Sequence, residues 1–349
     1  MRAAIILGAG FSKNSGLPVQ FEIPELIVKN CYENSFEKSI SLIIKRFYED
    51  VFGFAKGPDL PELDDILTCI DISTNSGHHL GIKYSSLHLR AVRRFLIYRL
   101  FTILGEKFTY SQDVKNLLLM LLQKYSKVDF IVLNWDTVLE NYINTINPST
   151  VIDYCNGGKY WAENSYDTGE ILKIIKIHGS SNWLYCDNCR VLINDTYSNV
   201  PPIKRAGFKA TDFKLFEEFC GINPETIESE NCFVCGNKIS SHIATFSFRK
   251  SFRENSFPDL WNQAEDALTH ADKWIFIGYS LPQADYEFKH LLKISELKLS
   301  HLKNGKPEID VVLLNSKNTV SKYKSFFGNR IGTICNGGII EYTKKQELD

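Results

Sequence analysis

Glycines and small polar residues follow an apolar segment at the start of the chain. Residues 3–7 are apolar and partly β-branched, as in a buried strand, and lead into Gly8-Ala9-Gly10-Phe11-Ser12. A strand that runs into Gly-x-Gly lets backbone N–H groups approach a phosphate, and the next helix N-terminus adds the positive end of its dipole. The third glycine of the dinucleotide-binding fingerprint is replaced by Lys13. A tight turn therefore remains an alternative to a nucleotide-binding loop.

Four later apolar segments also end in small or polar residues. In open α/β sheets, ligands bind at the carboxyl ends of the strands. The pattern therefore predicts a ligand site at one edge of a parallel sheet. The four endings are Asn134-Trp135-Asp136 after 130–133, His178-Gly179-Ser180 after 171–177, Gly278-Tyr279-Ser280-Leu281-Pro282 after 274–277, and Asn315 after 310–314.

Four of the nine cysteines form two Cys-x-x-Cys pairs, which are Cys186 with Cys189 and Cys232 with Cys235. The odd total and this spacing favour metal binding over a disulfide framework. Four thiolates are the closed tetrahedral ligand set of structural zinc, which leaves no open position for a substrate. The sequence therefore predicts a structural Zn²⁺ site, with degenerate, unoccupied knuckles as the alternative.

The last part of the chain alternates between predicted helices and strands. Helices are expected over 257–269, 286–297 and 319–326, with the strands at 274–277 and 310–314 between them, and the final residues, 343–349, form a polar tail. Such a βαβαβ order is typical of a parallel sheet. The predicted fold class is therefore α/β, with a doubly wound parallel Rossmann-like sheet, a helical insertion and a small zinc-binding module.

Three regions are expected. Residues 1–30, 126–183 and 244–349 form the Rossmann-like domain, 31–125 a helical insertion, and 184–243 a zinc-ribbon-like module with four cysteine ligands. Within the insertion, apolar residues recur at helical spacing over 36–52, 61–72, 86–104 and 111–124. Its densest basic cluster has two interpretations, a solvated or ion-paired helix face and a docking surface; the cluster is Arg90, Arg93, Arg94 and Arg99.

Composition narrows the class of partner. The 349 residues carry 40 Lys and Arg against 41 Asp and Glu, so the bulk charge does not attract nucleic acid or an anionic membrane. No apolar run reaches the roughly twenty residues of a membrane span, and Gly8 to Lys13 interrupt the start where a signal peptide would be apolar. We therefore expect a cytoplasmic protein without direct nucleic-acid or membrane binding.

The order of these motifs resembles the sirtuin (Sir2) superfamily. That order is Gly-Ala-Gly-x-Ser and Ser-Gly-x-Pro, then Asn-x-Asp, His-Gly, the paired Cys-x-x-Cys, Gly-x-Ser and Asn. The form Gly-Tyr-Ser-Leu-Pro-x-x-Asp at 278–285 is more similar to divergent bacterial Sir2-like proteins than to protein deacylases. The resemblance covers most of the chain outside about 30–125, and its specificity lies in the order of the motifs.

The resemblance implies cleavage of the N-glycosidic bond of NAD through an oxocarbenium-like state. Asn134 would orient the ribose or a water, Asp136 would recognise the nicotinamide carboxamide, and His178 would take a proton near neutral pH. Taken singly, an asparagine after a strand is often a turn residue and a histidine at a strand end is often structural. Other residues would hold the cofactor: Gly8, Ala9, Gly10, Phe11, Ser12 and Pro18 the pyrophosphate and nicotinamide ribose, Gly278 and Ser280 the phosphate and adenosine side, and Asn315 the adenosine ribose. Asp285 would join them, or would be a helix N-cap.

Two departures from the deacylases concern the protein substrate. The Asp-Phe-Arg that follows Gly-x-Pro in deacylases is Val-Gln-Phe at 19–21, and residues 245–250 lack their Phe-Gly-Glu. Water is then the simplest acceptor, which predicts an NAD glycohydrolase that releases nicotinamide and ADP-ribose. The resemblance further implies a gated bacterial antiviral effector that depletes NAD. Control is expected from a homo-oligomer or a separately encoded partner, such as an ATPase, docked on 31–125.

Two other functions stay open at this point. One is an NAD-dependent protein deacylase or ADP-ribosyltransferase with an unfamiliar groove. The other is a non-catalytic nucleotide-sensing or assembly module. The residues also leave NADP as an alternative substrate to NAD.

Overall fold

The computed structural model describes residues 1–29, 35–53, 60–161, 169–196, 198–221, 227–243, 256–303 and 305–348. The chain divides into two compact units. The first consists of Met1–Leu17, Phe108–Ser180 and Phe252–Asp349, and the second of Pro18–Lys107 and Ser181–Ser251. The second unit thus joins most of the helical region to the cysteine region. The three-part division expected from the sequence stays a prediction.

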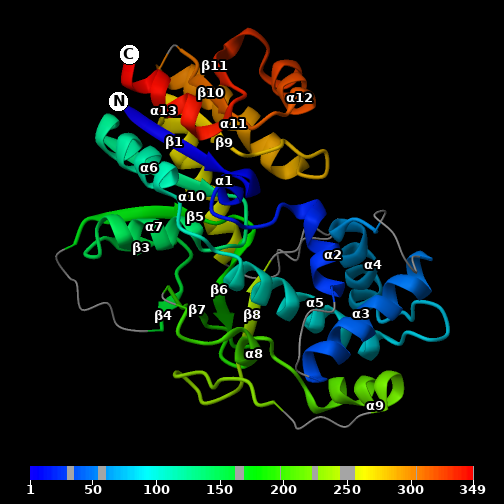
Figure 1. Cartoon of the computed structure of the whole chain (residues 1–349). Helices are drawn as coiled ribbons and strands as arrows, with labels where there is room; N and C mark the ends of the chain where they lie inside the picture. Colours follow the sequence, from blue (N-terminus) through cyan, green and yellow to red (C-terminus); the bar gives the residue numbers. More distant parts are fainter. Residues whose placement is uncertain are drawn as a thin grey trace. The chain divides into compact units, whose positions relative to one another are not determined.

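The first unit is built on a parallel sheet of seven strands (Figure 1). Its order is β11-β10-β9-β1-β2-β5-β3, and every pairing is parallel. The chain places β2, β5 and β3 on one side of β1 and then returns to place β9, β10 and β11 on the other. The strand order reverses at β1 and β9, which is where such sheets bind ligands. The strands are β1 Arg2–Leu7, β2 Lys127–Val132, β3 Val151–Asp153, β5 Ile171–Ile175, β9 Lys273–Ile277, β10 Glu308–Val312 and β11 Ile331–Cys335.

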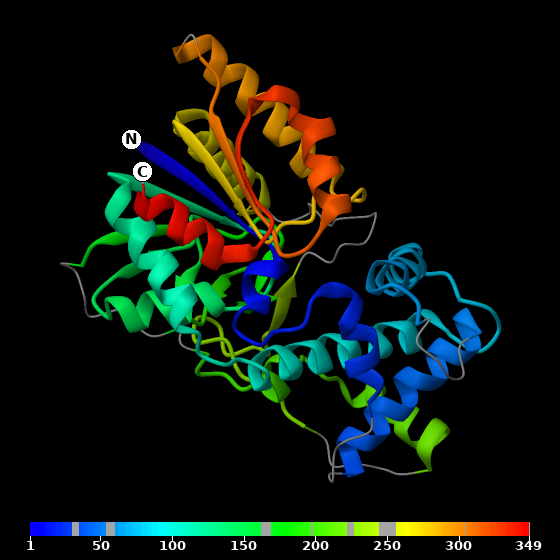
Figure 2. The same ribbon diagram turned by 45° about the horizontal axis from the view of Figure 1, so that its top comes forward.

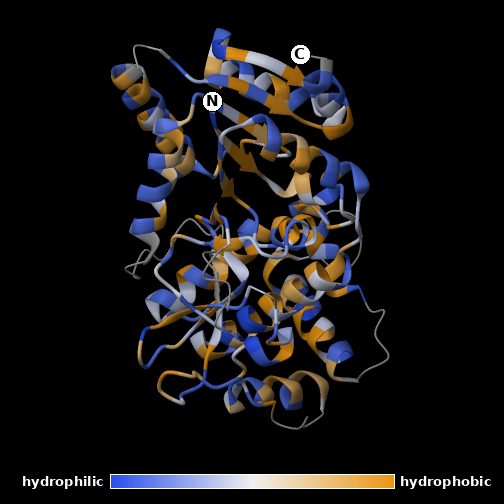
Figure 3. Cartoon of the chain, turned by 90° about the vertical axis from the view of Figure 1, so that its left-hand side faces the viewer, coloured by the Kyte–Doolittle hydropathy of each residue, from blue (hydrophilic) through white to orange (hydrophobic). Residues whose placement is uncertain are grey.

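Helices cover both faces of this sheet. Side chains of successive strand residues point to opposite faces, and residues 3–7 of β1 are all fully buried, so neither face is open to solvent there. The central strands are largely hydrophobic in Figure 3. Helix α6 packs against α7 and α13, and α10 packs against α11; Figure 2 shows α6 and α13 together on one side of the strands. The helices are α1 Ala9–Lys13, α6 Gln112–Lys124, α7 Val138–Ile146, α10 Ser256–His270, α11 Tyr286–Lys303, α12 Lys317–Phe327 and α13 Gly338–Leu348.

The predicted fold class is confirmed, while several elements of the first unit differ from the prediction. Strand β5 ends at Ile175, two residues before the predicted end, because the chain turns at 176–179 and Gly179 adopts a φ of +81°. The next strand, β6 Gly179–Tyr185, then begins. Strands β3 and β11 and helices α7 and α13 were not predicted, and the polar tail from 343 lies largely within α13.

The second unit is mainly helical. Its helices are α2 Ile23–Val28, α3 Ser35–Phe52, α4 Leu63–Ser76, α5 Ser86–Glu106, α8 Pro202–Arg205 and α9 Lys214–Cys220, and β6, β7 Leu192–Asn194 and β8 Ser240–Ile243 belong to a second, smaller sheet. The predicted helices at 36–52, 61–72 and 86–104 correspond to α3, α4 and α5, whereas the one at 111–124 is α6 of the first unit. No helix among the described residues is long and apolar enough to cross a membrane.

The basic cluster on α5 is an ion-paired helix face. Arg93 lies 2.7 Å from Asp71, and Arg99, which is fully buried, lies 2.7 Å from Glu37. The Arg94 guanidinium makes two hydrogen bonds to Asp212. Three of the four arginines are therefore ion-paired, while Arg90 donates to the Thr74 carbonyl at 3.4 Å; a docking role of this face stays a prediction.

Candidate functional site

The loops after β1 and β9 meet at the reversal of strand order. The backbone N–H of Gly8 donates to the Ile277 carbonyl at 3.1 Å, and that of Gly10 donates to the Gly278 carbonyl at 2.9 Å. A Cβ on Gly8 would lie 2.6 Å from the Gly278 oxygen, and a Cβ on Gly10 would lie 2.8 Å from the Gly278 Cα. Gly278 itself has a φ of +64°, and a Cβ there would lie 2.1 Å from the nitrogen of Phe11. These glycines are therefore required by the contact between the two loops.

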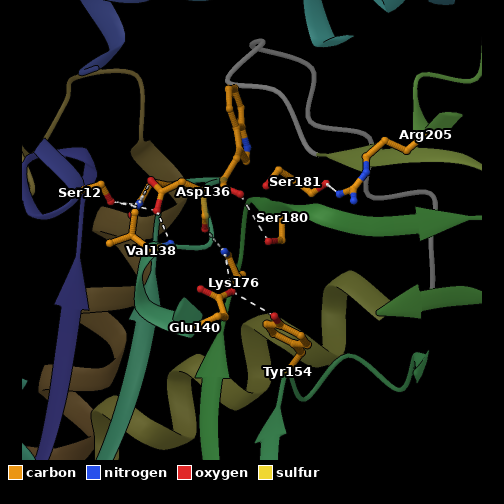
Figure 4. Close-up of polar contacts among 11 residues, drawn as sticks. Ser12, Asp136, Val138, Glu140, Tyr154, Lys176, Ser180, Ser181 and Arg205 are labelled. Carbon is orange, nitrogen blue, oxygen red and sulfur yellow. Dashed lines mark hydrogen bonds and ion pairs between the residues drawn. The ribbon is translucent and has the colours of Figure 1, made fainter. Parts of the chain in front are cut away.

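Ser12, Asn134 and Asp136 form one hydrogen-bonded cluster. Figure 4 labels two of its members, Ser12 and Asp136. The Ser12 hydroxyl, on α1, donates to Oδ1 of Asp136 at 3.0 Å and accepts from Nδ2 of Asn134 at 2.9 Å. The same Asn134 nitrogen donates to Oδ2 of Asp136. Because Asp136 accepts only, these bonds fix the orientation of the Asn134 amide. The structure thus brings together two of the predicted catalytic residues and one predicted cofactor residue.

The cluster has unused hydrogen-bonding capacity. Oδ1 of Asn134 is buried, and no group among the described residues donates to it. Asp136 accepts from Ser12 and Asn134 and, at 3.1 Å, from the backbone N–H of Val138, the first residue of α7. A carboxylate offers about four acceptor positions, so one remains. Since buried polar atoms are nearly always paired, the open Asn134 oxygen marks a place for a donor from a ligand or water.

His178 lies in the buried turn between β5 and β6. Its Nδ1 is 3.0 Å from the Leu133 carbonyl, and its Nε2 is 3.4 Å from Oδ1 of Asp285. The other Asp285 oxygen accepts from the Tyr279 hydroxyl at 2.8 Å. His178 and Asp285 have side chains only 1% exposed. Asp285, for which the sequence predicted a cofactor or capping role, is thus directed at the predicted base.

A buried lysine supports the loop that carries Asn134 and Asp136. Lys176, fully buried after β5, donates to the Asp136 carbonyl and to Oε1 of Glu140 on α7, the latter at 3.0 Å. The Tyr154 hydroxyl donates to the same Glu140 oxygen at 3.1 Å (Figure 4). This group was not predicted from the sequence. A signal was present, because Glu140 interrupts the apolar stripe of α7, and a charge in such a stripe is buried with a partner.

The remaining predicted cofactor residues differ in exposure. Phe11 is a core residue, Ala9 is half-buried, and Ser280 and Asn315 are exposed. Asn315 has a φ of +50°, and its N–H donates to the Asn336 carbonyl at 2.8 Å. Pro18 belongs to the second unit, and the departure at 245–250 lies outside the described residues. The cofactor-binding roles of these residues stay predictions.

The four paired cysteines form a cluster in the second unit. Their sulfur atoms all lie within 4.8 Å of one another, with 3.5 Å between Cys186 and Cys235 and 3.7 Å between Cys189 and Cys232. Four thiolates at about 2.3 Å from a zinc ion would be about 3.8 Å apart. The cluster therefore fits Zn²⁺, which would join two distant turns and supply no catalytic step.

Each Cys-x-x-Cys pair lies on a tight turn suited to this role. The Cys186 carbonyl accepts from the Arg190 N–H at 2.8 Å, and the Cys232 carbonyl accepts from the Gly236 N–H at 2.8 Å. Arg190 and Gly236 both adopt left-handed φ values, +58° and +74°. Gly236 thus supplies the left-handed conformation on which the second turn depends. The four cysteines are not joined by disulfides.

Comparison with known proteins gives matches among solved structures alone. No family model and no curated protein matches the chain. A sirtuin structure on substrate affinity matches with 15% identity, 99% of this chain, 93% of that chain and a TM-score of 0.47. A Sir2 structure with a p53 peptide and NAD⁺ has 14% sequence identity and a TM-score of 0.43. That match covers 98% of this chain and 90% of that chain. A structure on the mechanism and regulation of Sir2 enzymes has 12% sequence identity and a TM-score of 0.43. That match covers 100% of this chain and 94% of that chain. Because the sequence identities and TM-scores are this low, the chemistry of the site is argued from the residues of this chain.

Proposed function

We propose that the first unit is an NAD glycohydrolase, which cleaves NAD to nicotinamide and ADP-ribose. The observation that carries the proposal is the cluster of Ser12, Asn134 and Asp136, which lies after β1 and β2 and keeps a buried acceptor open on Asn134. The order of motifs in the sequence, which resembles that of sirtuins, supplies the substrate class. The reversal of strand order beside β1 supports a nucleotide at this edge.

The proposed reaction needs few protein groups. The bond between the ribose C1′ and the nicotinamide nitrogen breaks, the electron pair leaves with neutral nicotinamide, and positive charge develops on the ribose. Oδ1 of Asn134 accepts from a ribose hydroxyl or from the attacking water. The remaining acceptor position of Asp136 suits the carboxamide N–H of the leaving group. Water then bonds to C1′, and its proton passes to His178.

Lys176 and Glu140 support this site without contacting the substrate. The lysine holds the Asp136 carbonyl and so fixes the backbone on which Asn134 and Asp136 stand. A catalytic group must be held to within a fraction of an ångström, and a buried, hydrogen-bonded ion pair supplies such rigidity.

Water as the acceptor is supported by the sequence at 19–21, where the Asp-Phe-Arg of deacylases is replaced. We extend the proposal to the biological role implied by the resemblance, a bacterial antiphage effector that depletes NAD. Because uncontrolled hydrolysis would harm the producing cell, we propose that self-assembly or a separately encoded partner gates it. The gating would be contradicted if neither the rate of NAD turnover per chain nor the assembly size changed with protein concentration or with any candidate partner.

The test is NAD consumption with product identification by wild type, Asn134→Ala and Asn141→Ala. Asn141 is an exposed residue on α7 and serves as the matched control. We expect nicotinamide and ADP-ribose from wild type and control, and a loss of about a hundredfold or more in Asn134→Ala while this variant stays folded at the temperature of the assay. Equal rates in all three would refute the site. Nicotinamide release that requires an acyl-peptide would identify a deacylase instead.

A further inference from the structure

The His178 imidazole is held at both ring nitrogens by oxygen atoms. Nδ1 is 3.0 Å from the Leu133 carbonyl, and Nε2 is 3.4 Å from the Asp285 carboxylate. A carbonyl oxygen only accepts, so the proton of a neutral ring lies on Nδ1. Nε2 would then direct a lone pair at a negatively charged oxygen, which is repulsive.

A proton between Nε2 and Asp285 turns this repulsion into attraction. An imidazole nitrogen holds a proton more tightly than a carboxylate oxygen does. The proton therefore belongs on Nε2, which makes the ring an imidazolium and leaves Asp285 ionised. The pair is neutral as a whole, which suits a buried position, since a lone buried charge is costly.

Other contacts hold Asp285 in its ionised form. The Tyr279 hydroxyl donates to the second carboxylate oxygen at 2.8 Å, and a donor to a carboxylate favours the charged state. Burial, together with the Asp285 charge, raises the pKa of Tyr279 well above its ordinary value, so the phenol stays a donor. The Tyr323 hydroxyl in turn donates to the Tyr279 carbonyl at 3.0 Å, which anchors that residue.

We propose that Asp285 is a positioning residue that keeps a proton on Nε2 of His178 and thereby masks the base of the site in the unliganded chain. The masking rests on the proposed function, whereas the placement of the proton rests on the two oxygen atoms that face the ring nitrogens. For His178 to accept the proton of the attacking water, Nε2 must first lose its own proton or leave Asp285. Asp285 thus acts through His178 and makes no contact with the substrate.

Nuclear magnetic resonance of ¹⁵N-labelled histidine tests the placement of the proton without any activity. The wild-type His178 signal, assigned by its loss in His178→Gln, is expected to show hydrogen on both ring nitrogens. In Asp285→Asn the carboxamide donates to Nε2, so hydrogen should remain on Nδ1 alone. Tyr279→Phe is the matched control, because it removes a buried hydrogen bond to Asp285 while the pair with His178 stays, and it should keep the wild-type pattern. A bare Nε2 in wild type would overturn the proposal.

Hydrolysis of NAD by wild type and Asp285→Ala tests the masking. Asp285→Ala leaves the net charge of the pair at zero and leaves the lone pair of Nε2 open, so its turnover should rise several-fold over wild type with little change in KM. Turnover that falls or stays unchanged would overturn the masking. If no sample cleaves NAD while the proton pattern is as expected, the proposed function fails and the His178–Asp285 pair stands.

Discussion

Asn134 and Asp136 show how closely the candidate site depends on single atoms. The Asn134 amide nitrogen donates to both Ser12 and Asp136, so replacing that nitrogen by oxygen changes the sign of an interaction. In Asn134→Asp two carboxylates would face each other, which we expect to destabilise the fold by about 1–3 kcal/mol more than Asn134→Ala does near neutral pH. Thermal unfolding of both variants measures this difference in stability. The difference should become smaller at mildly acidic pH, where a proton between the carboxylates restores a hydrogen bond. A difference in stability that is independent of pH would contradict this interpretation.

Lys176 is a second residue whose effect follows from burial. Among the described residues, Lys176→Met would leave buried, charged Glu140 with the Tyr154 hydroxyl as its one side-chain donor, at a cost of about 3–5 kcal/mol. Adding Glu140→Gln removes that charge, so the double variant should be more stable than Lys176→Met alone. Urea denaturation of the single and double variants gives the coupling energy. Additive losses would show that the two residues act independently.

Among the elements, the contact between the loops after β1 and β9 sets the geometry of the sheet edge. Gly278→Ala would combine a positive φ with a Cβ 2.1 Å from the Phe11 nitrogen, whereas Gly77→Ala, at a similar φ of +68°, meets nothing within 4 Å. We expect about 1–2 kcal/mol from backbone strain at Gly77 and a distinctly larger loss at Gly278. Chemical denaturation of both variants separates strain from contact. Equal losses of stability in the two variants would mean that the two loops move apart and remove the close contact at Gly278.

The elements were predictable where a single local pattern decides them. Each of the strands β1, β2, β9 and β10 contains a run of apolar residues buried on both faces, and these runs appear in the sequence directly. Strand β11 is only partly buried and lies at the sheet edge, and α13 buries little more than Ile339 and Tyr342 among its polar residues, so neither has a strong pattern.

The site was predictable to the same extent. The order of motifs indicated Asn134, Asp136 and His178, but Lys176 reads as an exposed residue of an alternating strand. The partners of Lys176 and of Asp285 lie 36 and 107 residues away along the chain, so no local pattern contains them. Such pairings depend on the sheet topology, which places the strand ends together.

At the scale of the whole molecule, the division into two units separates the proposed chemistry from the cysteine cluster. The cluster lies in the second unit, and its four sulfur atoms join turns that are 43 or more residues apart in sequence. Metal binding to such a set contributes directly to folding, because the unfolded chain has no preformed site. Loss of the ion should therefore loosen the second unit while the seven-stranded sheet keeps its own core.

We expect one zinc ion per chain in the purified protein, and its loss in Cys232→Ser. Hydrogen exchange should then become faster in the turns around 186–190 and 232–237 and in β6 and β7, while β1, β2 and β9 keep their protection. Cys220→Ser is the matched control, because Cys220 is a free cysteine of the same unit outside the cluster; its zinc content and exchange should equal those of wild type. Full zinc content in Cys232→Ser would refute the metal site. Equal loss of protection in both units would show that they unfold together, because the ion would then stabilise the sheet as well as its own turns.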